Sequence, residues 1–238
     1  MCIRDRGRRA TTPIGRPAGG PQRPYTRQPV SRRPLGCLIE IAETLILTLI
    51  IFWVIQTFVA QPYRVEQSSM RATLEPEQYV LVDKLTPHFD DYSRGDIIVF
   101  NPAQRDAECS AEPDVPLDGV VPYIKRVIGQ PGDKIEIRDG LVLVNGAALD
   151  EPYTLGSHTE PGDQSSWTVS ADRLFVMGDN RTPGGSSDSR GMLGPICVRD
   201  VIGRAWLRYW PLDTLGILQT PTYPELPPGG DPAPAGEP

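Results

Sequence analysis

The chain has 238 residues, of which 39% are hydrophobic, so it can form one domain of ordinary size with additional segments. Its formal net charge is -6. It contains two histidines and four cysteines without CxxC or Cys/His spacing, which excludes a structural zinc site of the usual kind. We expect no metal, no cofactor and no nucleic-acid partner.

Residues 1–36 differ from the rest of the chain in composition. They carry nine Arg and one Asp, a formal charge of +8, whereas the remainder carries -14. The segment is rich in Pro and Gly and shows no apolar period, which predicts a disordered basic tail. Such a split in charge indicates that the two parts of the chain lie in different environments.

The next segment, residues 37–61, is predicted to be a transmembrane helix. Within it, the run Thr44–Ala60 has no charged residue and is close to the shortest length that spans a bilayer. The alternatives are a buried helix of a soluble domain and a cleaved signal peptide, whose cut site would need a small residue where Phe58 stands. Because Arg-rich flanks stay in the cytoplasm, we expect a single-pass protein of the cell membrane with its N-terminus inside and everything after Ala60 outside.

Residues 62–219 are predicted to form a mainly β, antiparallel extracytoplasmic domain with a small cap-like insertion around 138–170. Short β-branched or aromatic runs, separated by Gly, Pro and Asp, occur at 77–85, 95–102, 123–129, 133–149, 173–178 and 201–212. Asn145-Gly146 predicts a two-residue hairpin turn. No helical period long enough to cover a parallel sheet follows the apolar segment. Residues 220–238, with seven Pro and three Gly, are predicted to be disordered.

Two serines in VEQSSMRATL, residues 65–74, raise the question of a nucleophile and its base. A serine hydroxyl reacts only when another group takes its proton. His88 and His158 lie in loop-like sequence, which favours a surface role. Of the three lysines, Lys125 is the one inside an apolar strand pattern, where desolvation favours the neutral amine. Alternation puts Lys125 and Arg126 on opposite faces of that strand, and a solvated edge-strand lysine is the alternative.

Four segments of the chain resemble those of the bacterial type I signal peptidases, in the same order and approximate spacing. They are SSMRATL, RGDIIVF, YIKRVIGQPGDKI and MGDNRTPGGSSDSRGMLGPI, and the resemblance runs from about Leu38 to Leu215. It implies a membrane-anchored serine endopeptidase that removes signal peptides from secreted preproteins by acyl transfer. By the same resemblance, Ser69 is the nucleophile and Lys125 the general base.

The resemblance also implies roles for residues around this pair. Ser186 would orient the lysine amine, with Ser187 as the alternative because the TPGG segment is longer than in well-known members. The remaining residues would be structural: Asp188 and Arg190 as an ion pair, and Asp179 and Asn180 in the GDN turn of the family.

Two positions depart from the family pattern. The oxyanion is expected to be held by the Ser69 backbone N–H and by a second donor. Relatives often have Ser or Gly at the position of Gln67, whose side-chain amide is the candidate donor here. Ala72 stands where the family usually has Pro, so we expect a looser turn behind the nucleophile.

An extended peptide substrate is expected to add as a strand between the segments before Ser69 and before Lys125, with Val65 and Tyr123 lining small pockets for Ala-like residues. The expected partners are preprotein signal peptides, the lipid bilayer and the secretion translocon. A specialised processing peptidase with few substrates and an inactive membrane-tethered β module are the alternative functions. A disulfide between Cys109 and Cys197 is one possibility on the outer side.

Overall fold

The computed structural model describes residues 34–85, 91–102, 109, 120–155, 158–162, 164–191, 193–224 and 226–230. The chain divides into two compact units, residues 1–45 and 46–238. Apart from its last three residues, the predicted basic tail lies outside the described part of the chain.

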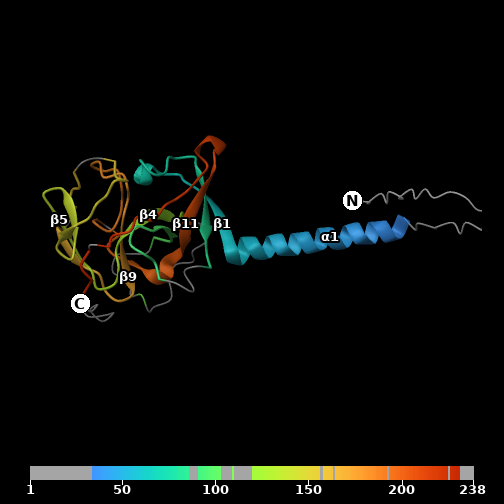
Figure 1. The fold of residues 1–238 in the computed structure, drawn as a ribbon, viewed down its shortest axis with the longest axis horizontal. Helices are drawn as coiled ribbons and strands as arrows, with labels where there is room; N and C mark the ends of the chain where they lie inside the picture. Colours follow the sequence, from blue (N-terminus) through green and yellow to red (C-terminus); the bar gives the residue numbers. More distant parts are fainter. Residues whose placement is uncertain are drawn as a thin grey trace, which may run out of the picture. The chain divides into compact units, whose positions relative to one another are not determined.

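Helix α1 spans Pro34–Val54 and passes into a π-helical turn, η1, at Ile55–Val59 (Figure 1). The helix predicted over 37–61 therefore begins and ends earlier than expected. Ala60 has extended φ -152 and ψ 137, because strand β1 begins there and Ala60 pairs with Asp83. In the part of the chain that the structure describes, no helix is both long enough and apolar enough to cross a membrane. The predicted transmembrane helix stays unconfirmed.

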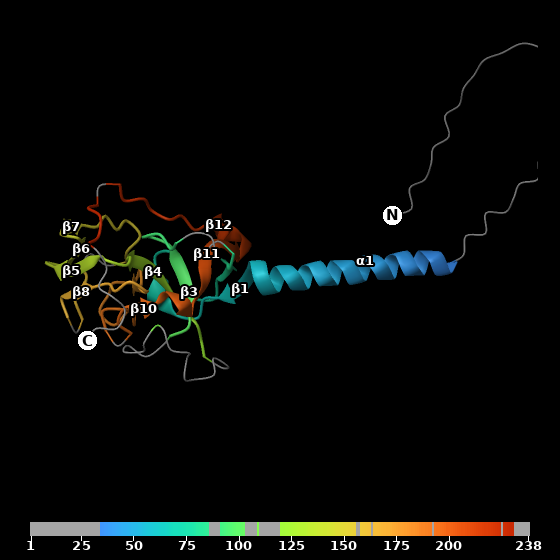
Figure 2. The same ribbon diagram turned by 90° about the horizontal axis from the view of Figure 1, so that it is seen from below.

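The described strands form two sheets (Figures 1 and 2), and every strand pair in them is antiparallel, which confirms the mainly β, antiparallel part of the predicted fold class. The larger sheet has the order β1-β2-β11-β3-β4-β9-β10, with β12 paired to β11. Its strands are β1 (Ala60–Arg64), β2 (Tyr79–Asp83), β3 (Ile97–Phe100), β4 (Tyr123–Gly129), β9 (Arg173–Met177), β10 (Ile196–Cys197), β11 (Val201–Trp210) and β12 (Gly216–Ile217).

The smaller sheet has the order β7-β6-β5-β8 and overlaps the region where an insertion is predicted. Its strands are β5 (Lys134–Arg138), β6 (Leu141–Val144), β7 (Ala147–Ala148) and β8 (Ser166–Thr168). Short 3-10 helices lie at η2 (Ser68–Met70), η4 (Val198–Asp200) and η5 (Leu212–Thr214).

Alternation of buried and exposed side chains explains the strands that the sequence predicts. In β5, Ile135 and Ile137 are buried while the flanking Lys134 and Arg138 are exposed, as a half-buried strand requires. Asn145 and Gly146 have φ of 54 and 86 and connect β6 to β7, which confirms the predicted hairpin turn.

The turn after β1 is held by apolar contacts. Met70 and Leu74 are fully buried in a cluster with Val65 and with side chains of β2, β3 and β11. Burial of a methionine or leucine side chain is worth roughly 1.5–3 kcal/mol, so these two residues fix the segment between them and β2.

The predicted disorder of residues 220–238 is wrong for residues 220–230, apart from residue 225, which lies outside the described part. We call residues 220–230 the C-terminal strap. Thr220 Oγ1 donates a hydrogen bond to Asp96 Oδ1 at 2.7 Å, and Tyr223 and Leu226 pack against a core cluster to which both sheets contribute. Composition alone predicted disorder, but these two apolar side chains bind the segment to the domain. Residues 231–238 lie outside the described part.

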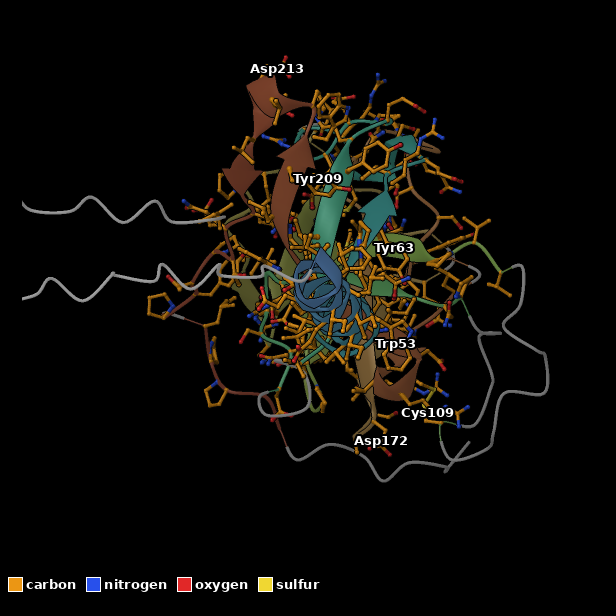
Figure 3. The ribbon with its side chains drawn as sticks, turned by 90° about the vertical axis from the view of Figure 1, so that its right-hand side faces the viewer. Trp53, Tyr63, Cys109, Asp172, Tyr209 and Asp213 are labelled. Carbon is orange, nitrogen blue, oxygen red and sulfur yellow. A yellow bond between two sulfur atoms is a disulfide. The ribbon has the colours of Figure 1, made fainter. Side chains whose placement is uncertain are left out.

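A disulfide joins Cys109, which follows β3 and is labelled in Figure 3, to Cys197 of β10, with their Cα atoms 5.4 Å apart. The two cysteines are 88 residues apart in sequence, so the bridge could not be derived from their spacing. It holds Cys109 against β10, at the far edge of the larger sheet.

The turn that follows η2 has a left-handed backbone. Ala72 has φ 87 and Glu77 has φ 71. Proline is restricted to φ near -65°, so it cannot occupy position 72 in this turn. The expectation that Ala72 only loosens a turn built for Pro is therefore wrong, because this turn has a different backbone.

We predict opposite effects of two substitutions at this position. Ala72→Gly should stabilise the fold by about 1 kcal/mol, because glycine adopts positive φ without steric cost. Ala72→Pro should destabilise it by about 3 kcal/mol or more. Urea unfolding measures both, with Ala147→Gly in strand β7 as the control that should lose stability. A stabilising Ala72→Pro would contradict this backbone.

Candidate active site

Ser69 lies in the short helix η2, between the edge strand β1 and the left-handed turn. Gln67 precedes the helix with extended φ -111 and ψ 160, and Ser69 is 4% exposed. The first N–H groups of a helix have no partner within it, so the Ser69 N–H is available to an incoming group. The buried Met70 side chain fixes the other end of this helix.

Lys125 extends from β4 to Ser69. Its Nζ lies 2.7 Å from Ser69 Oγ and donates to the Ile124 carbonyl oxygen at 3.0 Å, and its side chain is 1% exposed. The Tyr123 ring centroid lies 5.2 Å from Nζ. Burial lowers the pKa of Lys125 from 10.5 to about 8, against the opposing effect of the Asp188 and Asp179 carboxylates. The alternative of a solvated edge-strand lysine is wrong.

The predicted ion pair of Asp188 and Arg190 is present beside this lysine. Arg190 Nε and Nη2 each donate to the Asp188 carboxylate at 2.9 Å, and the Gly178 N–H donates to Asp188 Oδ2 at 3.1 Å. Burial alone would raise the pKa of Asp188, but the hydrogen-bonded Arg190 guanidinium outweighs it and holds that pKa below its usual value.

Ser186 lies inside the site, while Ser187 is exposed. The Ser186 hydroxyl is near enough to Asp188 to help lower the pKa of that carboxyl, yet it has no hydrogen-bond partner of ordinary geometry in the described part. A methyl group on Gly178 would lie 2.3 Å from Ser186 Oγ and 2.4 Å from the Ser69 carbonyl oxygen. Only glycine at position 178 lets both serines approach this turn.

The GDN turn holds the backbone of Ser68 and Ser69. The Asn180 N–H donates to the Ser69 carbonyl oxygen at 3.0 Å, and Asn180 Nδ2 donates to the Ser68 carbonyl oxygen at 3.1 Å. Arg181, which sequence reasoning missed, donates from Nε to the Gly178 carbonyl oxygen at 2.8 Å and pairs with Glu151. The turn is thus fixed at both ends.

Sequence reasoning also missed the partner of Arg126. Arg126 is 2% exposed and donates from Nε and Nη2 to the Asp179 carboxylate at 2.9 and 2.7 Å. Its guanidinium lies 3.9 Å from the Tyr153 ring centroid. Lys125 and Arg126 therefore have different surroundings, as alternation predicts. A buried arginine requires an anionic partner, so the sequence could have indicated that a carboxylate such as Asp179 pairs with Arg126.

A groove of about 190 Å³ opens beside Ser69. Its lining includes Tyr63, labelled in Figure 3, together with the predicted substrate-binding residues Val65 and Tyr123. Gln67 also lines the groove and is exposed, and its side chain makes no hydrogen bond within the described residues. Strand β1 is at the edge of its sheet, and β4 pairs with β9 from Arg126 onward, so the groove runs between two strand segments with free edges.

Neither candidate histidine is placed at this site by the described residues. His158 lies against Gly140, where a methyl group would contact the imidazole Nδ1. His88 lies outside the described residues.

Comparison with known proteins assigns the family. The family described as "Signal peptidase, peptidase S26" matches residues 38–210. Signal peptidase I of Leptolyngbya laminosa is 36% identical over 208 residues, which are 86% of this chain and 94% of that protein. Signal peptidase I P of Bacillus subtilis subsp. natto is 31% identical over 192 residues, which are 77% of this chain and 95% of that protein.

A solved structure of a signal peptidase I from Enterococcus faecalis is 25% identical, covers 48% of this chain and 97% of that chain, and has a TM-score of 0.35. From the family match and the two close relatives, the chain belongs to the peptidase S26 family of signal peptidases and is a serine endopeptidase.

Proposed function

We propose that this enzyme removes N-terminal signal peptides from preproteins by acyl transfer through a Ser69–Lys125 dyad. The observation that carries the mechanism is the buried lysine amine 2.7 Å from the serine hydroxyl. A desolvated lysine is neutral over a wider pH range than a solvated one, so it can accept the serine proton. The names of the relatives support the choice of signal peptides as substrate.

The reaction has two halves. Ser69 Oγ attacks the scissile carbonyl carbon while Lys125 Nζ takes the hydroxyl proton, and the resulting ammonium gives that proton to the leaving amine. This releases the mature protein and leaves the signal peptide as an ester on Ser69. A water molecule that gives its proton to Lys125 then attacks the ester, and Lys125 returns that proton to Ser69 Oγ as the acyl–oxygen bond breaks and frees the signal peptide.

The oxyanion is stabilised by the Ser69 N–H and, in this proposal, by the Gln67 side-chain amide. Each such donor contributes about 3–4 kcal/mol to the transition state in serine proteases. The exposed position of Gln67 in the groove leaves its amide free to turn toward the oxyanion. Ser186 would orient the lysine amine, and the Asp188–Arg190 pair would hold the loop that carries Ser186.

The groove supports selection of small residues. The groove of about 190 Å³ must hold several residues of an extended peptide between walls that include Val65 and Tyr123, which favours small, Ala-like side chains. The free edges of β1 and of the start of β4 offer backbone hydrogen bonds to such a peptide, which would bind as an added strand.

We further propose attachment to the cytoplasmic membrane through the apolar segment at residues 38–60, with the Arg-rich end inside and the β domain outside. The large apolar side chains from Ile39 to Ile55 are 40–65% exposed, and four around the β11–β12 hairpin, whose tip carries Asp213 in Figure 3, are 50–70% exposed: Trp210, Leu212, Leu215 and Ile217. Lipid would cover such surfaces.

An alkaline wash of membranes that contain the protein tests this attachment. Retention of the protein in the membranes supports attachment, and complete release contradicts it.

Substitution of the nucleophile tests the function. Ser69→Ala should cleave a preprotein with Ala at both recognition positions at least about 10³-fold more slowly than the unchanged enzyme, because no other group can form the acyl ester. Cleavage is followed by mass spectrometry of the products at equal folded concentration. Ser68→Ala is the matched control and should keep most activity. Equal cleavage by Ser69→Ala, or loss in Ser68→Ala alone, would refute Ser69.

The pH dependence tests the base. The lysine accepts a proton only when neutral, so kcat/KM should rise with pH and level off above a pH of about 8. Lys125→Arg should abolish cleavage because arginine keeps its proton. Lys134→Met, which changes an exposed lysine, should leave the profile unchanged. A rate independent of pH between 6 and 9 would argue against Lys125 as the base.

A further inference from the structure

The C-terminal strap joins the two sheets through contacts at both of its ends. Thr220 binds Asp96, which immediately precedes β3 of the larger sheet. The Pro227 carbonyl oxygen accepts a hydrogen bond from Asn145 Nδ2 at 3.0 Å, in the β6–β7 hairpin of the smaller sheet. The strap therefore contacts both sheets.

Tyr223, in the middle of the strap, reaches a residue that contacts the site. Its hydroxyl lies 3.2 Å from the hydroxyl of Tyr153, which follows β7. The Tyr153 ring covers the Arg126 guanidinium at 3.9 Å. Tyr153 therefore connects the strap to Arg126, through its hydroxyl on one side and its ring on the other.

Arg126 connects this aromatic pair to the nucleophile. It is the neighbour of Lys125 in β4, and its two hydrogen bonds to Asp179 hold β4 against the GDN turn. The same turn donates the Asn180 N–H to the Ser69 carbonyl oxygen. A shift of Arg126 would therefore change the distance between the strand that carries the base and the helix that carries the nucleophile.

We propose that the C-terminal strap is a positioning element of the active site, with Tyr223 acting through Tyr153 on Arg126. This inference rests on the proposed function of Ser69 and Lys125. Removal of the Tyr223 side chain admits water to Tyr153 and Arg126, which weakens the ion pair because a higher local dielectric reduces its attraction. The dyad then spends less time at the reactive distance, and catalysis is sensitive to such displacements.

The packing of the strap makes this effect separable from unfolding. A cavity of about 990 Å³ lies along the strap and is lined by Arg94, Arg204 and the strap itself. The strap is held by separate contacts at Thr220, Tyr223, Leu226 and Pro227, so loss of one side chain should loosen it while the two sheets keep their own hydrogen bonds. Thr222, on the same strap, is exposed and serves as a matched control.

The experiment compares the full-length chain with Tyr223→Ala, Tyr223→Phe, Tyr153→Leu and Thr222→Ala. Preprotein cleavage gives kcat and KM, and amide hydrogen exchange by mass spectrometry reports on the GDN turn and β4. We expect kcat to fall about 10-fold or more in Tyr223→Ala and Tyr153→Leu with little change in KM. Tyr223→Phe should lose less, and Thr222→Ala nothing. Exchange of the Asn180 amide should be faster wherever kcat falls.

Unchanged kcat and unchanged exchange in both Tyr223→Ala and Tyr153→Leu would overturn the inference. So would a rise in KM alone, because that would locate the strap in substrate binding. If the unchanged enzyme cleaves no preprotein, the proposed function fails, and the exchange rates alone decide whether the strap holds the GDN turn.

Discussion

Burial of the Lys125 amine away from water is the constraint on which the surrounding structure depends. A lysine with 1% exposure cannot keep its ordinary affinity for a proton, because water no longer stabilises the charged form. Here burial outweighs two carboxylates that favour the ammonium, and the pKa falls to about 8. Asp188 is in turn neutralised by Arg190, which limits how strongly that carboxylate can restore the charge.

The neighbouring residue meets the opposite requirement. Arginine keeps its charge, so a buried Arg126 must have a counter-ion, and Asp179 supplies it with two hydrogen bonds. One strand thus carries the proposed base, which must lose its proton, and a cation that must keep its proton, on opposite faces. Asp179, which neutralises Arg126, is followed directly by Asn180, whose N–H holds the Ser69 carbonyl oxygen. One turn therefore contacts both Arg126 and the backbone of Ser69.

Local sequence patterns predicted much of this arrangement, because strand alternation and turn preferences depend on only a few neighbouring residues. Alternation along 123–129 separated Lys125 from Arg126, and Asn145-Gly146 marked a hairpin turn. Contacts between distant segments were not predictable in the same way. The Arg126–Asp179 pair and the Cys109–Cys197 bridge depend on how the sheets pack, which no local spacing encodes.

Amino-acid composition gave a wrong prediction where a few side chains determine the structure of a segment. The Pro-rich segment at 220–230 is bound through Thr220, Tyr223 and Leu226, although its average character is that of a disordered tail. The expectation drawn from the resemblance was likewise wrong at Ala72, because a φ of 87 excludes proline at this position. In both cases one or two residues outweigh the average of the segment.

The most direct test of the central claim is an NMR titration of the lysine side chains. The chain has only three lysines, so selective labelling gives three resolvable signals. A buried base predicts one signal that titrates near pH 8, and that signal should be absent from Lys125→Met. Titration of all three signals at about 10.4, the value of a solvated lysine, would contradict the account.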